Sequence, residues 1–381
     1  MPRRNIRASE TVPLEYVGRE QSLLKHWVLE EYLRSWAQKL GSAARTREVH
    51  LFYVDCFAGP WEAQSERLED TSIAIGLNAL EEAAGRWSKQ GIIRTSAIFV
   101  EKKPESFANL KRYLEARRGR VATHPFPGSF AEHVARIDQM IGSSAAFLFI
   151  DPTDFKDVAM DFIAPLAKRR FRDVMINVMF NDVNRFKDDE RGFLREQMKG
   201  LFGLKSGDLP QDLDESALFT LYRAQLKKTC GVDYAADLAI PHPKMERTWF
   251  RLVVGGHNKA VLELFRDVEK RVCGTVAGQV RAAAKQRDKD QLSFTLPGND
   301  DRFDRFRNEG LAAARRRLTE RKPGSVTPFM LLWTEYLQEL HITRSDVARI
   351  LRDLIVEGRA RVRGKDDAQK AVQDHHLIEF L

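Results

Sequence analysis

The sequence predicts an α/β protein: a doubly wound, Rossmann-like sheet of seven strands, followed by a C-terminal winged helix-turn-helix domain. Two observations carry this prediction. Short apolar runs alternate five times with amphipathic, helix-length stretches, and this order favours a parallel sheet with helices on both faces. Near the C-terminus, three helical stretches precede a segment in which basic residues alternate, which is the outline of a winged helix.

The composition limits the possible functions but does not identify one. The chain has 381 residues, 43% of them hydrophobic, and a formal net charge of +8. This excess is compatible with an anionic partner but does not establish one. The three cysteines, Cys56, Cys230 and Cys273, have no metal-ligand spacing, so we expect neither a disulfide framework nor a metal site.

No run of 18 apolar residues exists, and no apolar signal core follows Met1-Pro2-Arg3-Arg4. We therefore expect no membrane span and a reducing, cytoplasmic setting.

The N-terminal segment, residues 1–45, is expected to form a loose arm and a helix from Gly18 to about Leu40. The strands are expected at His50–Asp55, Thr95–Glu101, Val121–Phe126, Ala145–Asp151, Val174–Phe180, Trp249–Gly255 and Gln291–Leu296. The connecting helices are expected at Ser72–Lys89, from Pro104 to Arg117, and at Ser129–Ile141, Val158–Lys168 and Lys259–Val272, with polar helical material over 187–230. Thr71 and Ser72 are candidate caps, and Pro104 suits a first helical turn.

A boundary near residues 298–299 divides the sheet domain (46–298) from the C-terminal domain (299–381). The C-terminal helices are expected at Phe303–Arg317, Phe329–Leu340 and Thr343–Glu357, the last ended by Gly358. A strand beyond it would place its alternating basic residues on one face: Arg359, Arg361, Arg363 and Lys365. With Arg344, Arg349 and Arg352 of the recognition helix, these side chains are the candidate nucleic-acid contacts; the alternative is a winged helix that contacts protein.

Polar residues end four of the expected strands: Asp55, Glu101, Asp151 and the Asn177–Asn181 stretch. In a doubly wound sheet these ends gather along one edge, where ligands bind. Glu101 can accept both hydroxyls of a ribose. The loop after Asp55 has one glycine, Gly59, in place of a G-x-G-x-x-G phosphate loop, which points to a nucleoside ligand without phosphates. S-adenosylmethionine is the common one, with Asp55, Phe57, Gly59 and Glu101 as its binding residues; the alternative is that Asp55 and Glu101 only cap strands.

Asp151-Pro152-Thr153-Asp154 ends the clearest buried strand. It resembles, in its first two residues, the acid or amide followed by Pro-Pro and an aromatic residue of amino-group methyltransferases. That resemblance assigns Asp151 and Pro152 to the target amine, with Asn177 and Asn181 lining the substrate side and Phe155 available for stacking. A metal-dependent nuclease using Asp151, Asp154 and Asp157 is a weaker alternative.

Taken together, three stretches resemble the three-Cys-motif partner protein family: Tyr53–Pro60, Phe149–Pro152 and Ile176–Phe186. The resemblance implies a class I methyltransferase-like fold with a winged helix, and a partner related to radical S-adenosylmethionine enzymes. Two departures lie at the cofactor and substrate loops: Trp61, where the family usually has Gly, and Thr153-Asp154, where it usually has Phe-Gly.

Two functions are consistent with these residues. The first is an S-adenosylmethionine-dependent methyltransferase that acts on nucleic acid, with a base amine as its target. The alternative is a catalytically degenerate methyltransferase fold that binds nucleic acid or a partner in a mobile-element or phage-defence system, and Trp61 and Thr153-Asp154 favour it.

Overall fold

The structure is a computed structural model. It describes residues 12–13, 16, 19–59, 71–152, 157–180, 183, 191–205, 209–210, 212–242, 245–274, 278, 280, 302–364 and 371–381.

The centre of the molecule is a sheet of seven strands in the order β3-β2-β1-β4-β5-β7-β6. The strands are β1 Val49–Asp55, β2 Ile93–Glu101, β3 Ala122–Pro127, β4 Ala145–Ile150, β5 Arg172–Val178, β6 Tyr234–Pro241 and β7 Thr248–Gly256. The first five pair in parallel, whereas β7 runs antiparallel to both β5 and β6. The arrangement is α/β and Rossmann-like, as predicted.

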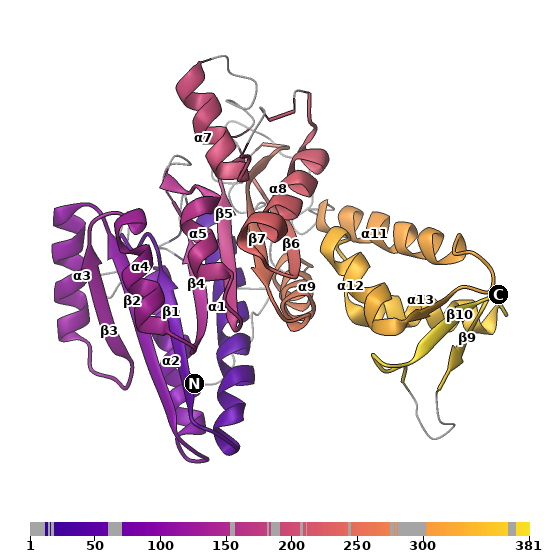
Figure 1. Cartoon of the computed structure of the whole chain (residues 1–381), viewed down its shortest axis with the longest axis horizontal. Coiled ribbons are helices and arrows are strands. Elements are labelled where there is room, and N and C mark those ends of the chain that lie inside the picture. The colour runs from indigo at the N-terminus through magenta and orange to yellow at the C-terminus, as the bar shows by residue number, and fades with distance from the viewer. Residues whose placement is uncertain are drawn as a thin grey trace.

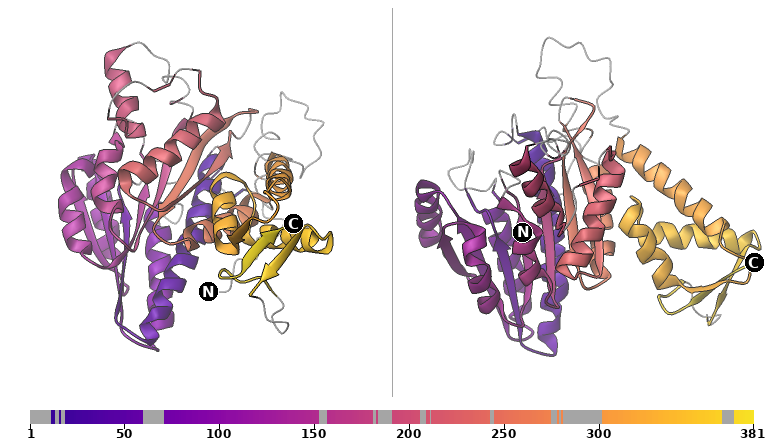
Figure 2. Two further views of the ribbon diagram at one scale, coloured as in Figure 1. Left: turned by 45° about the vertical axis from the view of Figure 1, so that its right-hand side comes forward. Right: turned by 45° about the horizontal axis from the view of Figure 1, so that its top comes forward.

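Helices cover both faces of this sheet (Figures 1 and 2). One core cluster joins α1 Glu20–Gly41, α2 Ser72–Trp87, α3 Pro104–Ala116 and α9 Ala260–Val272 to the sheet. The other contains α4 Phe130–Ile141, α5 Met160–Ala167, α7 Gly192–Phe202 and α8 Glu215–Cys230. The central strands are therefore buried from two sides, which explains why they read as continuous apolar runs rather than alternating ones.

Local chemistry begins these helices where the sequence expects it. The side chain of Thr71 caps α2 by accepting a hydrogen bond from the backbone of Ala74. Pro104 occupies the first turn of α3, and Ser129 forms a capping box with Glu132 at the start of α4. Each of these helix starts comes after the end of a strand, at the carboxyl edge of the sheet.

The sequence prediction of the last two sheet strands is wrong in one place. The sixth strand is β6, Tyr234–Pro241, which we did not expect, and the predicted Trp249–Gly255 strand is the seventh. Gln291–Leu296 and the predicted domain boundary at 298–299 lie outside the described residues. Strand β6 contains three alanines, a buried aspartate and a terminal proline, all of which are disfavoured in strands, so tertiary contacts override its weak local preference.

The C-terminal unit begins with α11 Arg302–Thr319 and continues with β8 Val326–Pro328, α12 Phe329–Glu339, α13 Arg344–Val356, β9 Ala360–Arg363 and β10 Leu377–Phe380. Its three strands form a small antiparallel sheet in the order β8-β10-β9. Thr343 and Asp346 form a capping box at the start of α13. Gly358 follows this helix with a φ of 71°, which explains the glycine at that position.

The C-terminal unit packs against the β6 edge of the large sheet through α12 (Figure 1). A fully buried arginine makes the joint: Arg266 of α9 donates from Nε to the carbonyl of Leu337 in α12, at 2.9 Å. Its Nη1 donates to the carbonyl of Asp237 at 3.0 Å and to Glu269 Oε2 at 2.6 Å. The buried guanidinium of Arg266 at this joint therefore has hydrogen-bond partners in both units.

Two further findings concern the described part of the chain. No helix in it combines the length and apolar character that a membrane crossing requires. Cys56, Cys230 and Cys273 are all buried.

Candidate functional site

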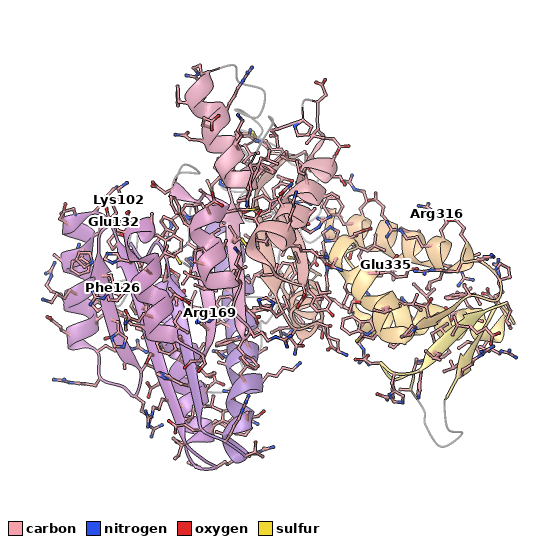
Figure 3. All side chains as sticks on the ribbon, in the orientation of Figure 1. Lys102, Phe126, Glu132, Arg169, Arg316 and Glu335 are labelled. Carbon is pink, nitrogen blue, oxygen red and sulfur yellow. The ribbon has the colours of Figure 1, made fainter. Side chains whose placement is uncertain are left out.

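A cavity of about 810 Å³ opens where the carboxyl ends of β1, β2 and β3 meet. It lies beside the position between β1 and β4 at which the strand order reverses, where doubly wound sheets bind their ligands. Its lining includes Cys56, Phe57, Glu101, Lys102, Gly128, Ser129, Phe130, Glu132 and Asp157. Figure 3 labels Lys102 and Glu132 near one another at this end of the sheet.

Glu101 ends β2 at the wall of this cavity and is 3% exposed. Its Oε1 accepts a hydrogen bond from the backbone N–H of Lys103 at 2.5 Å, while burial raises the pKa of its carboxyl. The Glu101 carbonyl accepts a hydrogen bond from the N–H of Gly128 at 3.0 Å. This backbone contact brings the turn between β3 and α4 to the carboxylate, so Gly128, Ser129 and Phe130 share one cavity with Glu101.

Phe57 lines the same cavity. Its ring centroid is 6.0 Å from that of Phe130, so two aromatic side chains from different turns pack together at the cavity wall. Gly59 follows, donating its N–H to the carbonyl of Phe57 at 2.9 Å, and does not line the cavity. Pro60 and Trp61 lie outside the described residues.

Asp55 supports this turn from beneath and is fully buried. Its carboxylate accepts hydrogen bonds from Ser72 Oγ at 2.6 Å, Tyr53 Oη at 3.3 Å and the N–H of Phe57 at 3.2 Å. Burial outweighs these donors and raises the pKa of Asp55 to about 6. The side chain does not line the cavity, so its geometry suits a role in shaping the Phe57 turn.

A second polar cluster stands at the ends of β4 and β5. Asp151 Oδ2 lies 2.5 Å from Lys25 Nζ of α1, and Asp151 Oδ1 accepts a hydrogen bond from Asn177 Nδ2 at 2.6 Å. Lys25 also stands over the Phe250 ring, 5.5 Å from its centroid. Asn177 is 3% exposed, and its Oδ1 has no hydrogen-bond partner among the described residues.

The structure thus brings Asp151 and Asn177 together, with the buried Pro152 next in the chain. Asn181, Thr153, Asp154 and Phe155 lie outside the described residues. Sequence reasoning missed Lys25 as the partner of Asp151; the available signal was a lysine within the apolar side of the first helix. Within the described residues, no three His, Cys, Asp or Glu side chains gather as a metal site would require.

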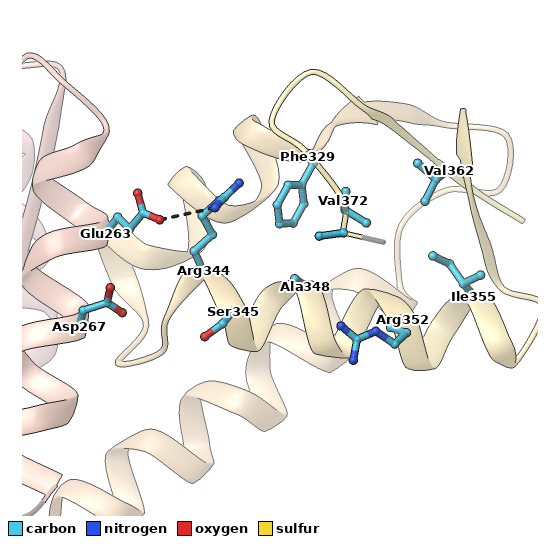
Figure 4. Close-up of a pocket in the computed structure, with 11 residues that line it drawn as sticks. Glu263, Asp267, Phe329, Arg344, Ser345, Ala348, Arg352, Ile355, Val362 and Val372 are labelled. Carbon is cyan, nitrogen blue, oxygen red and sulfur yellow. Dashed lines mark ion pairs between the residues drawn. The ribbon is translucent and has the colours of Figure 1, made fainter. Parts of the chain in front are cut away.

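The candidate nucleic-acid residues divide into three groups. Arg344 is held at the sheet domain: it pairs with Glu263 at 3.5 Å and Asp374 at 2.9 Å, as Figure 4 shows for Glu263. Arg361 and Arg363 alternate on β9, as predicted, and both pair with Glu379 of β10 at 2.5 Å.

The remaining arginines are exposed on α13 and just after it. Arg349 lies 3.4 Å from Asp346. Arg352 and Arg359 have no ion-pair partner within the described ranges, and Lys365 lies outside them. The candidate residues therefore differ in how far their charge is already compensated.

No protein-family model matches this chain, and no curated protein matches it. The resemblance to three-Cys-motif partner proteins consequently stays a prediction.

Several solved structures are similar to parts of the chain. One is the cofactor-bound protein Rv0187 from MTB, with 14% identity and a TM-score of 0.29 over 60% of this chain and 79% of that one. Another is LPL1258 from Legionella pneumophila, with 8% identity and a TM-score of 0.33 over 64% and 91%. A third is human methyltransferase-like protein 13 in complex with SAH, with 10% identity and a TM-score of 0.31 over 63% and 89%. Because these TM-scores are low, we define the fold by the order of its strands and not by these three similar structures.

Proposed function

We propose that this protein binds S-adenosylmethionine and acts as a methyltransferase-like protein on nucleic acid. The observation that carries the proposal is the cavity at the carboxyl edge, which Glu101 at the end of β2 lines together with the rings of Phe57 and Phe130. Its volume of about 810 Å³ falls in the range of small-molecule sites. A seven-stranded sheet with one reversed strand next to its edge is also the arrangement that the class I methyltransferase resemblance implies.

The cavity residues suggest how the cofactor would be held. Glu101 would accept the two ribose hydroxyls, and Phe57 and Phe130 would contact the planar base. Asp55 would act by shaping the Phe57 turn, after which Gly59 lies outside the cavity lining. When bound, S-adenosylmethionine would supply the methyl group, and the protein would contribute mainly alignment of donor and acceptor.

Calorimetry with S-adenosylmethionine and its demethylated product tests the cofactor. We expect the wild-type protein to bind both, and Glu101→Ala to lose at least about tenfold in affinity, because a hydrogen bond to a charged group is worth about 1.5–3 kcal/mol. Glu105→Ala is the matched control, since this exposed acid begins α3 without lining the cavity. If neither compound binds the wild-type protein, the proposal fails.

A second function is favoured by one specific contact. Both carboxylate oxygens of Asp151 are already engaged, by Lys25 and by Asn177, so a target amine would have to displace one of them. This favours a degenerate methyltransferase fold that serves as a binding subunit. Transfer of labelled methyl groups from the cofactor to DNA and RNA separates the two functions: transfer that is lost in Asp151→Asn supports the enzyme, and cofactor binding without any transfer supports the binding subunit.

The arrangement of α11, α12, α13 and the β8-β10-β9 sheet supports a winged helix whose basic strand contacts nucleic acid. Glu379 accepts hydrogen bonds from Arg361 and Arg363 and compensates their positive charge. These hydrogen bonds lower the pKa of Glu379 to about 2. We expect Glu379→Gln to raise affinity for a labelled duplex several-fold at low salt, and Arg361→Ala with Arg363→Ala to lower it and reduce its salt dependence. Equal affinities in all three proteins would contradict the nucleic-acid role.

The family resemblance further suggests a three-Cys-motif protein related to radical S-adenosylmethionine enzymes as a partner. Co-expression followed by gel filtration tests this suggestion, and separate elution of the two proteins would exclude a stable complex.

A further inference from the structure

A groove of about 420 Å³ runs between the sheet domain and the C-terminal unit, apart from the cofactor cavity; of the candidate nucleic-acid residues, Arg344 and Arg352 line it. Its walls are α9 and α13, and we call it the α9–α13 groove (Figure 4). Glu263 and Asp267 line it from α9, and Ser345 and Arg352 line it from α13. Between these polar positions, apolar side chains such as Phe329, Ala348 and Val372 form the floor, whereas Ile355 and Val362 lie beyond Arg352 (Figure 4).

One end of the groove is acidic. Glu263 and Asp267 are four residues apart on α9 and therefore lie on one side of that helix. Arg344 compensates Glu263 at 3.5 Å, but it is shared with Asp374 at 2.9 Å. Asp267 has no ion-pair partner among the described residues, and burial together with the charge of Glu263 raises its pKa. This end of the groove therefore favours a positively charged group.

Further along α13 the groove is basic, one turn before its apolar far end at Ile355 and Val362. Arg352 is exposed, lines the groove and has no ion-pair partner in the described part of the chain. From Ser345 to Arg352 the axis of α13 rises about 10 Å, at 1.5 Å for each residue. Three steps of an extended peptide, at about 3.3 Å each, cover the same distance. A four-residue extended segment therefore spans the charged stretch of the groove, from its acidic end at Glu263 and Asp267 to its basic end at Arg352.

We propose that the α9–α13 groove binds an extended segment of a partner protein with the order basic, apolar, apolar, acidic. The basic side chain would lie against Glu263 and Asp267, the apolar side chains on the floor, and the acidic side chain against Arg352. A nucleic acid is disfavoured here, because its phosphates would face both carboxylates. The proposal does not depend on the cofactor site, so loss of S-adenosylmethionine binding would leave it intact.

Selection from a displayed library of random hexapeptides tests the proposal on the full-length protein. We expect the wild-type protein to enrich peptides with the basic-apolar-apolar-acidic order. Asp267→Lys combined with Arg352→Glu inverts the two ends of the groove at unchanged net charge. This variant should enrich the inverted order and bind a peptide selected by the wild-type protein at least tenfold more weakly.

The matched control combines Asp353→Lys with Arg316→Glu, which makes the same two charge changes at exposed positions outside the groove. It should enrich the wild-type order. A photo-crosslinking residue in place of one apolar position of a selected peptide gives a second readout on the wild-type protein, independent of whether the variants fold. The label is expected on α13 or on β9.

Three results would overturn the proposal: no enriched order in the wild-type protein, the same order in wild-type and inverted proteins, or crosslinks away from the groove. A fourth such result concerns binding of a nucleic-acid duplex. If Arg352→Glu weakens it more than the Arg361→Ala, Arg363→Ala pair does, the groove holds nucleic acid rather than a peptide.

Discussion

At the scale of single residues, the two aspartates that end β1 and β4 have different roles. Asp55 is enclosed by Tyr53, Ser72 and the Phe57 turn, whereas Asp151 is bound by cationic Lys25 and by Asn177. A neighbouring ammonium compensates a carboxylate, but neutral donors compensate burial only in part. The same residue type at equivalent strand ends is thus a buried support in one case and one half of an ion pair in the other.

The raised pKa of Asp55 makes a prediction about stability and pH. Because its folded-state pKa is about 6, above the ordinary aspartate value of about 3.9, the folded state binds the proton more tightly. The free energy of unfolding should therefore fall as pH rises from about 4 to about 6, by up to about 3 kcal/mol from this group, and then level off. Urea denaturation across this range should show the fall in the wild-type protein and a reduced fall in Asp55→Asn.

Asp173 adds a separate decrease, since burial raises its pKa to about 7. It is present in both proteins, so the difference between their profiles isolates Asp55. Parallel profiles would show that Asp55 does not titrate in this range.

Lys25 and Asp151 allow a second test at this scale. Their side chains are 12% and 18% exposed, so removing one charge leaves the other poorly solvated. Lys25→Met should lower the free energy of unfolding by about 3 kcal/mol, and Lys25→Met with Asp151→Asn should cost less than the sum of the two single changes. A double-mutant cycle by urea denaturation measures this coupling, and additive effects would mean that the pair contributes no net interaction.

At the scale of elements, β6 depends on neighbours rather than on its own composition. Its Asp237 is 2% exposed and pairs with Arg223 of α8 and, at 3.1 Å, with Arg251 of β7. Burial by itself would raise the pKa of Asp237, but Arg251 and Arg223 outweigh it and lower the pKa to about 2. A charge in the middle of a strand is therefore compensated by the helix and the strand on either side of it.

Asp237→Ala should lower the free energy of unfolding by about 3 kcal/mol or more, because two poorly solvated arginines lose their carboxylate. Asp233→Ala is the control, since its side chain is 64% exposed just before the same strand, and it should change stability by about 0.5 kcal/mol or less. The midpoint of urea denaturation gives both values. Similar losses in the two variants would contradict a stabilising role for the Asp237 network.

At the scale of the whole molecule, the C-terminal unit is joined to the sheet by buried polar contacts. Arg266 reaches Leu337 of α12, and Glu269 Oε1 lies 2.6 Å from His341 Nδ1 beyond that helix. Apolar residues of both units also belong to one core cluster. Because these contacts cross between the units, the two should unfold together rather than as separate domains.

Scanning calorimetry of the wild-type protein should accordingly show one transition. Arg266→Ala removes the joint and leaves Glu269 buried beside His341, so the melting temperature should fall by several degrees and the transition should broaden or split. Arg316→Ala, an exposed change on α11, should leave the single transition unchanged. Two transitions in the wild-type protein would show that the units are energetically independent.

Most elements were predictable because their signals are local. Apolar runs mark four of the five parallel strands, and Thr71, Pro104 and Ser129 mark helix starts, since capping depends on residues a few positions apart. Strand β6 was not predictable in the same way, because its stability comes from Arg223 and Arg251 rather than from strand propensity.

By itself, the sequence determined the alternation of strands and helices and the polar residues at four strand ends, since both follow from local periodicity and from the rule that parallel strands share an edge. Only the tertiary structure decided which of these residues line the cavity and which are compensated: Glu101 borders open space, Asp55 is enclosed, and Asp151 meets Lys25 from 126 positions earlier in the chain. The physical reason is that burial and charge compensation depend on neighbours in space, which the order of residues along the chain does not specify.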